Sequence, residues 1–103
     1  MKPFTQRIIQ IIHSIPKGRV MSYGQIAACA GNPRAARQVA RALHSMSEKH
    51  ELPWHRVVNA KGEIAVKDPS RQRQLLEMEG VVVIHDKISM REYQHDTPLC
   101  FEE

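Results

Sequence analysis

Long apolar runs, paired cysteines and regularly spaced histidines are missing from this sequence, and each absence excludes a class of protein. No apolar stretch approaches the ~20 residues of a membrane helix, and the first residues lack the apolar core of a signal peptide, so we expect a cytoplasmic protein without a membrane partner. The only cysteines, Cys29 and Cys100, lie far apart without ligand spacing and suit reduced thiols better than a disulfide framework. The six histidines form no His-x-x-x-His pair, so we predict no metal and no other cofactor.

The charges present are distributed unevenly along the chain. The 103 residues, 42% of them apolar, predict one domain over residues 1–103. Residues 1–73 hold 13 Lys and Arg against 4 Asp and Glu, a balance of +9, whereas residues 74–103 hold 2 against 7, which is −5 and leaves the net +4. A basic surface suggests a polyanionic partner, and solvated charges without a partner explain the charge equally well.

The first part of the chain has the pattern of two amphipathic helices. Apolar residues recur at helical spacing over residues 3–15, and turn residues follow at 16–19. Ser22, three residues before Gln25, has the form of a capping box, so a second helix is predicted to begin there.

A third helix is predicted to follow at once. Gly31 suits the positive-φ position that ends a helix, and Asn32 is expected to cap a helix over residues 33–46. Arginines recur along one side of this helix: Arg34, Arg37 and Arg41. Two short helices joined by a tight turn, the second of them basic, are typical of a helix-turn-helix, although an ordinary helical hairpin has the same pattern.

The second half is predicted to hold a hairpin, a helix and a tail. Residues 57–58 and 64–66 are β-branched and apolar around a polar turn, so the expected fold is mainly α with a small β-hairpin, a winged helix-turn-helix. Asp68 is expected to cap a last helix that ends at residues 79–80, with its apolar residues inward: Leu75, Leu76 and Met78. Residues 81–84 are predicted to form a packed strand, and Tyr93 to dock a loose tail over residues 93–103.

Five stretches that keep their order over residues 4–80 resemble the DNA-binding domain of O6-alkylguanine-DNA alkyltransferases, which repair alkylated guanine. They are Ile15-Pro16-x-Gly18-x-Val20, Ser22-Tyr23-Gly24-Gln25-Ile26-Ala27, Gly31-Asn32-Pro33-x-Ala35-Ala36-Arg37-x-Val39, Pro53-Trp54-His55-Arg56-Val57-Val58 and Leu75-Leu76-x-x-Glu79-Gly80. Five matches in register are far more specific than any one of them.

One departure from the family pattern decides the chemistry. The family places its alkyl-accepting cysteine between the Pro and His of this motif, and here Trp54 stands there, as in the alkyltransferase-like branch. Alkyl transfer needs a thiolate, and an indole nitrogen is only a hydrogen-bond donor. Neither Cys29 nor Cys100 falls within the motif. We therefore expect no enzymatic activity.

The resemblance implies roles for individual residues. It implies a minor-groove interface in which Tyr23 rotates the target nucleotide and Arg37 fills the gap in the base stack, and a structural relay of His55 and Glu79. The implied base pocket comprises Tyr23, Trp54, His55, Arg56 and Lys67. The implied DNA-binding residues are Tyr23, Arg34, Ala35, Arg37 and Arg41.

The functional hypothesis is therefore a non-enzymatic damage sensor. It implies a monomer that binds double-stranded DNA containing O6-alkylguanine, flips the base and marks the site for nucleotide excision repair proteins; in a bacterium it would be associated with the nucleoid. Two alternatives stay open: a winged-helix transcription regulator that reads sequence, and an enzyme that removes the alkyl group with His55 and Glu79.

Overall fold

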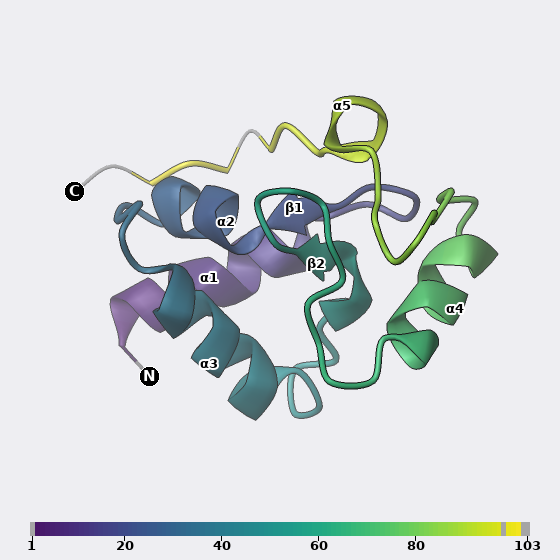
Figure 1. Cartoon of the computed structure of the whole chain (residues 1–103). Coiled ribbons are helices and arrows are strands. Elements are labelled where there is room, and N and C mark those ends of the chain that lie inside the picture. Colours follow the sequence, from purple (N-terminus) through teal and green to yellow (C-terminus); the bar gives the residue numbers. More distant parts are fainter. Residues whose placement is uncertain (1, 98, 102–103) are drawn as a thin grey trace.

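The computed structural model describes residues 2–97 and 99–101, and helices are its main regular elements (Figure 1). The elements in chain order are α1 (Pro3–His13), β1 (Met21–Ser22), α2 (Tyr23–Cys29), α3 (Ala36–Met46), η1 (Trp54–Arg56, a single 3-10 turn), β2 (Val57–Val58), α4 (Ser70–Met78) and α5 (Met90–Tyr93). Two cores are present: the larger lies among α1, α2 and α3, and a smaller one lies around Leu76 and Val58. Among the described residues, no helix combines the length and the apolar character that crossing a membrane requires.

Helices α2 and α3 pack against each other and against α1, which gives the helix-turn-helix that the sequence predicts. The start of α2 is as expected, because the Ser22 hydroxyl accepts a hydrogen bond from the Gln25 N–H at 3.0 Å. Gly31 has φ +109° and ends the helix, also as expected. The predicted start of α3 is wrong: the Asn32 side chain accepts from the Arg34 N–H in a tight turn, and the helix begins only at Ala36.

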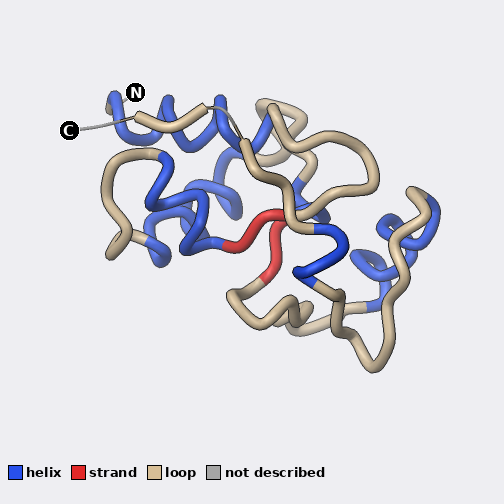
Figure 2. Tube along the Cα trace, turned by 90° about the horizontal axis from the view of Figure 1, so that it is seen from above, coloured by secondary structure: helices blue, strands red, loops and turns tan. Residues whose placement is uncertain are grey.

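The predicted hairpin is also wrong. β2 pairs in parallel with β1, Met21 opposite Val57 and Ser22 opposite Val58, so the two strands come from distant parts of the chain (Figure 2). The segment expected to form the second hairpin strand, residues 64–66, forms no strand. Its first N–H, that of Ile64, donates instead to the carbonyl of Asp86 at 2.8 Å. The β-branched residues of β2 therefore pair with an earlier strand of the chain and not with the segment that follows the next turn.

Helix α4 buries a different set of side chains from the one predicted. Asp68 does accept hydrogen bonds from Ser70 at the start of the helix, and Leu76 is fully buried. Met78 instead points to solvent, with 75% of its surface exposed, and polar Gln72 takes an inward position at 2%. Residues 81–84 are not a packed strand either, since Val81 is buried but Val82 and Ile84 are exposed.

The tail predicted to be loose is attached over its described part. Val20 is hydrogen-bonded to two residues of the tail. Its N–H donates to the Tyr93 carbonyl at 2.9 Å, and its carbonyl accepts from the His95 N–H at 2.8 Å. The Gln25 side chain also donates to the His95 carbonyl, at 2.6 Å. The chain then runs back along α2, where the Phe101 N–H donates to the Cys29 carbonyl (Figure 1). Pro98 and residues 102–103 lie outside the described residues.

This return path brings together two cysteines that are far apart in sequence. The Cys100 thiol donates a hydrogen bond to the Cys29 sulfur at 2.7 Å, and both are free thiols. Burial, and then the neighbouring Cys100, raise the pKa of Cys29 to about 12. Cys29 is therefore a protonated, unreactive thiol at neutral pH.

Candidate nucleic-acid interface

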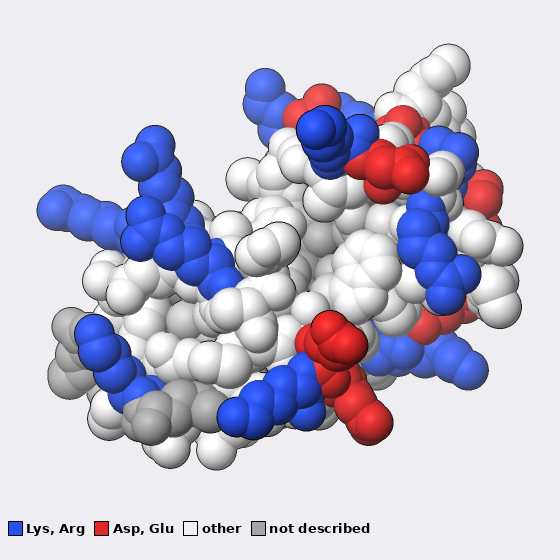
Figure 3. All heavy atoms as spheres, turned by 90° about the horizontal axis from the view of Figure 1, so that it is seen from below, with Lys and Arg blue, Asp and Glu red and all other residues white. Residues whose placement is uncertain are grey.

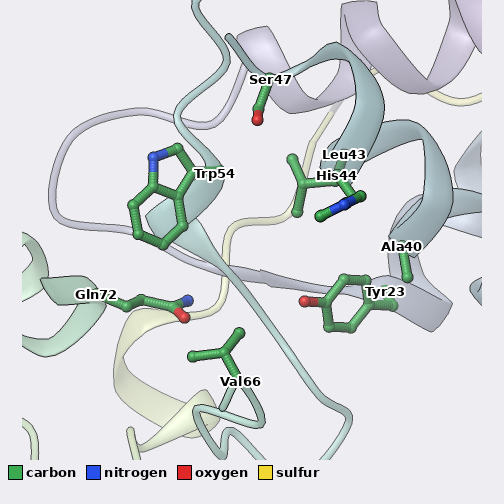
Figure 4. A pocket seen from close by; sticks show the side chains of 8 residues that line it. All are labelled: Tyr23, Ala40, Leu43, His44, Ser47, Trp54, Val66 and Gln72. Atoms are coloured by element: carbon green, nitrogen blue, oxygen red, sulfur yellow. The ribbon is translucent and has the colours of Figure 1, made fainter. Parts of the chain in front are cut away.

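A pocket of about 290 Å³ opens between α3, η1 and the start of α4, close to the lower size limit of about 300 Å³ for small-molecule sites. Its lining residues are Tyr23, Ala40, Leu43, His44, Ser47, Trp54, Val66 and Gln72. In the close view the rings of Trp54 and Tyr23 stand on opposite sides, and the Tyr23 hydroxyl and the Gln72 carboxamide both point inward (Figure 4). Two aromatic walls with a few convergent polar groups suit a flat, polar ligand such as a nucleobase.

Trp54 is held in place by the turn of η1. Its ring contacts the His55 ring edge-on, with the centroids 6.1 Å apart. From α4, the Gln72 Nε2 donates to the carbonyls of His55 at 3.0 Å and Val57 at 2.9 Å, which fixes the backbone on both sides of Arg56. A residue at the Trp54 position is thereby presented to the pocket by a rigid loop.

Beneath η1, Glu79 is the centre of a hydrogen-bonded network. Arg56 approaches its carboxylate side-on, with Nη2 2.6 Å from Oε2 and Nε 3.0 Å from Oε1. The His55 Nε2 lies 2.8 Å from Oε2, and the Gly18 N–H donates to Oε1 at 3.1 Å. Arg56 also donates to the Ile15 carbonyl at 2.8 Å. One carboxylate thus joins the turn after α1, the η1 loop and the end of α4.

The Glu79 network makes the folded protein less stable as the solution becomes acidic. Burial alone would raise the pKa of Glu79, but the hydrogen bonds from Arg56, His55 and Gly18 outweigh it and lower the pKa from 4.5 to about 2. A carboxyl whose pKa is lower in the folded protein contributes stability above pH 4.5 and loses it as the pH falls from about 4.5 to about 2.

We expect Glu79 to account for about 3 kcal/mol of the fall in unfolding free energy over that range. Urea unfolding at pH 5 and pH 2.5, followed by Trp54 fluorescence, measures it. Glu79→Gln, which cannot ionise, should be less stable at pH 5 and lose less on acidification; an equal loss in both proteins would contradict the assignment.

The structure divides the base-pocket residues that the resemblance implied. Tyr23 and Trp54 line one pocket, although they are 31 positions apart in the sequence. His55 and Arg56 are not among the lining residues and are hydrogen-bonded to Glu79, and Lys67 is exposed next to the lining residue Val66. Whether His55, Arg56 and Lys67 contact the base, as the resemblance implies, stays a prediction. Burial raises the pKa of Tyr23, so its hydroxyl stays a hydrogen-bond donor at neutral pH.

The three arginines among the predicted DNA-contact residues are exposed, whereas Tyr23 is half-buried and Ala35 is buried. Arg34, Arg37 and Arg41 are all exposed, the last two one turn apart on α3. Ala35 is only 5% exposed and packs in the core, and its contact with DNA stays a prediction. Figure 3 shows Lys and Arg side chains without Asp or Glu over the left part of one face, and a mixture of both signs over its right part and lower edge. Such an arrangement favours a polyanion on one side of the molecule.

Sequence reasoning missed several pocket residues. Leu43, His44 and Ser47 come from the C-terminal end of α3 and the residue after it, Val66 from the loop before α4, and Gln72 from α4 itself. The spacing of residues 43, 44 and 47 places them on one side of a helix, which is the only signal in the sequence that groups them. Nothing local marks Gln72, because a glutamine on an amphipathic helix is normally solvated.

Comparison with known proteins places this arrangement in a family. Residues 3–81 match the family described as "6-O-methylguanine DNA methyltransferase, DNA binding domain". The chain belongs to this family. The predicted resemblance is thus confirmed over most of the sequence.

Curated relatives in the family are similar over most of the chain. The DNA base-flipping protein of Vibrio parahaemolyticus is 46% identical over 97 residues, which are 91% of this chain and 97% of that protein. Alkyltransferase-like protein 1 of Schizosaccharomyces pombe is 37% identical over 102 residues, 95% of this chain and 93% of that protein. The DNA base-flipping protein of Escherichia coli is 52% identical over 82 residues, 78% of this chain but only 64% of that longer protein.

Solved structures of the family share the fold. The crystal structure of S. pombe Atl1 in complex with damaged DNA containing O6-carboxymethylguanine has a TM-score of 0.85 and 34% identity, and covers 94% of this chain and 98% of that one. The crystal structure of Mycobacterium tuberculosis OGT in complex with DNA has a TM-score of 0.61 and 34% identity, and covers 77% of this chain and 50% of that one. The predicted class, a mainly helical domain with a helix-turn-helix, is confirmed; only its β-hairpin is replaced by the parallel pair.

Proposed function

We propose that this protein is a non-enzymatic sensor of O6-alkylguanine in double-stranded DNA. The basic side of α3 binds the minor groove, and the damaged base rotates out of the helix into the pocket between Trp54 and Tyr23. Arg37 then enters the base stack and fills the gap. The observation that carries the proposal is Trp54, which lines the pocket at the position of the acceptor cysteine in the family motif. The relatives named for base flipping and the relative solved with alkylated DNA support the ligand class.

Among the described residues that line the pocket, none is a cysteine that could accept the alkyl group as the family's acceptor does. Transfer requires a thiolate beside a base, and the two cysteines of the chain lie together at α2 and the tail rather than in the pocket lining. His55 is hydrogen-bonded to Glu79 and is not among the lining residues, which suits a role in holding η1. Because the base is bound but not repaired, the complex persists. A long-lived, distorted site of this kind is a signal for excision repair proteins, which we propose as the next partners of this monomeric domain.

Lesion binding without repair is the first expected result. A duplex with one O6-methylguanine should bind more tightly than the matched guanine duplex, because only the alkylated base gains the pocket contacts. After overnight incubation the recovered DNA should retain its methyl group, and the mass of the protein should be unchanged. Base analysis of the DNA and mass spectrometry of the protein measure both. A gain of 14 Da on the protein, the mass of one transferred methyl group, would overturn the proposal.

Truncation of the aromatic wall should remove selectivity more than affinity. We expect Trp54→Ala to bind undamaged DNA nearly as the wild type does, because phosphate contacts supply most of that affinity. Its preference for the O6-methylguanine duplex should fall by roughly 1–3 kcal/mol, the scale of one lost stacking contact. Binding titrations with both duplexes at one salt concentration give the ratio, and a thermal unfolding curve checks the fold. An unchanged ratio in a folded variant would make Trp54 a core residue only.

A further inference from the structure

We infer that the side-chain oxygen of Gln72 recognises the amino group at C2 of the base in the pocket. This inference rests on the proposed function and adds a group that reads the base itself. Gln72 is 2% exposed, and its Nε2 donates to the carbonyls of His55 at 3.0 Å and Val57 at 2.9 Å. Rotating the carboxamide by half a turn would press its oxygen against these two carbonyl oxygens, which are acceptors. The neighbouring backbone thus fixes which end of the amide is free.

The free end is an acceptor that the protein leaves without a donor. Among the described residues, none donates a hydrogen bond to the Gln72 Oε1. This oxygen is not fully buried, so a ligand in the pocket can reach it. The carboxamide lies at the pocket wall below Trp54, opposite the Tyr23 hydroxyl (Figure 4). Buried polar groups are nearly always paired, so an acceptor at the wall of a pocket predicts a donor on the ligand.

O6-alkylguanine carries one such donor. Alkylation at O6 removes the hydrogen from N1 and leaves N1, N3, N7 and O6 as acceptors, so the amino group at C2 is the only N–H donor of the base. The other polar side chains at the pocket wall include the hydroxyls of Tyr23 and Ser47, which can donate to those acceptors. The pocket thus has one free acceptor and several donors, whereas the base has one donor and several acceptors, so the two sets match. The pocket should therefore favour 2-amino purines and discriminate against alkylated bases without this group.

The test compares bases that differ only in the amino group. Duplexes carry guanine, O6-methylguanine or O6-methylhypoxanthine, each opposite an abasic site, so that differences in pairing strength do not affect extrusion. We expect the wild type to bind O6-methylguanine about five- to tenfold more tightly than O6-methylhypoxanthine, the scale of one buried neutral hydrogen bond. Equal binding of the two methylated bases, both above guanine, overturns the role of Gln72 and leaves the sensor standing. If neither methylated base binds better than guanine, the sensor proposal itself fails.

Three variants separate recognition from positioning of the loop. Gln72→Met keeps the length of the side chain but has no acceptor, so the ratio between the methylated bases should fall to about one even if both affinities decrease. In Gln72→Glu, a protonated carboxyl donates to the backbone carbonyls and still turns an oxygen to the pocket. This variant should therefore retain the affinity ratio between the two methylated bases, and it also supplies the test if Gln72→Met does not fold. Gln74→Met, the same change on the exposed side of α4, should behave as wild type. If Gln72→Met keeps the wild-type ratio, Gln72 only holds η1 in place and the inference is wrong.

Discussion

Glu79→Ala is expected to lower the unfolding free energy by about 3–5 kcal/mol, because it leaves a largely buried arginine without its partner. The side chains of Glu79 and Arg56 are only 9% and 16% exposed. Their network joins three segments of the chain, so its loss loosens η1, the loop that carries Trp54. Small domains are stable by only about 5–15 kcal/mol, and the variant should lie near the limit of folding at 37 °C. Urea or thermal unfolding measures the change.

Glu77→Ala is the matched control for this prediction. Glu77 lies two residues earlier on α4 and is exposed, so the same chemical change should alter stability by no more than about 0.5 kcal/mol. If Glu79→Ala loses less than about 1 kcal/mol, the Glu79 network is not what fixes η1, and the explanation given for the acid sensitivity would be wrong with it.

Arg37→Ala is expected to weaken binding of the lesion duplex by ~1–3 kcal/mol, the scale of a stacked cationic contact. Arg37 is exposed on the first turn of α3, so the fold should be unaffected. An arginine that fills the gap left by a flipped base acts mainly on the damaged duplex, whereas one that only contacts phosphate weakens damaged and undamaged DNA alike. Titrations with both duplexes over a range of salt concentrations distinguish these roles.

Arg71→Ala provides the comparison, because Arg71 is an exposed arginine on α4 and its removal changes the net charge equally. We expect it to retain lesion affinity within about twofold, the range of a single screened surface charge. A fluorescent base analogue opposite the lesion should report less extrusion in Arg37→Ala only. Wild-type affinity in Arg37→Ala would contradict its assignment as the residue that enters the stack.

Local signals in the sequence predicted the start and end of α2 well, but they misplaced the start of α3 and predicted strand partners poorly. Ser22 and Gly31 were interpreted correctly because a cap or a positive φ depends on neighbouring residues alone. Val57–Val58 was assigned to a hairpin because nothing nearby in the sequence indicates that its partner lies at Met21–Ser22. Strand pairing over 36 positions is a tertiary contact, and propensity does not determine it.

The pocket was predictable only in part, for the same reason. The resemblance indicated Tyr23 and Trp54, and the structure brings both to one cavity. His55 was placed beside them because it follows Trp54, but adjacent residues of a 3-10 turn face different directions, and Glu79 draws this one away. Gln72 could not be found in the sequence, since its partners are two backbone carbonyls that come near it only in the folded protein.

The pairing of Val20 with the tail has a consequence for how the protein is made. Val20 is fully buried, and its N–H and carbonyl are bonded to residues 93 and 95, which a ribosome adds more than 70 residues later. Until then, these two groups in the middle of the domain have no backbone partner, and buried unpaired backbone groups are strongly unfavourable. The three N-terminal helices can associate as they emerge, but the native fold closes only when the nascent chain has reached residue 95. Synthesis therefore delays the last step of folding, and a chain that stops before residue 93 cannot complete it.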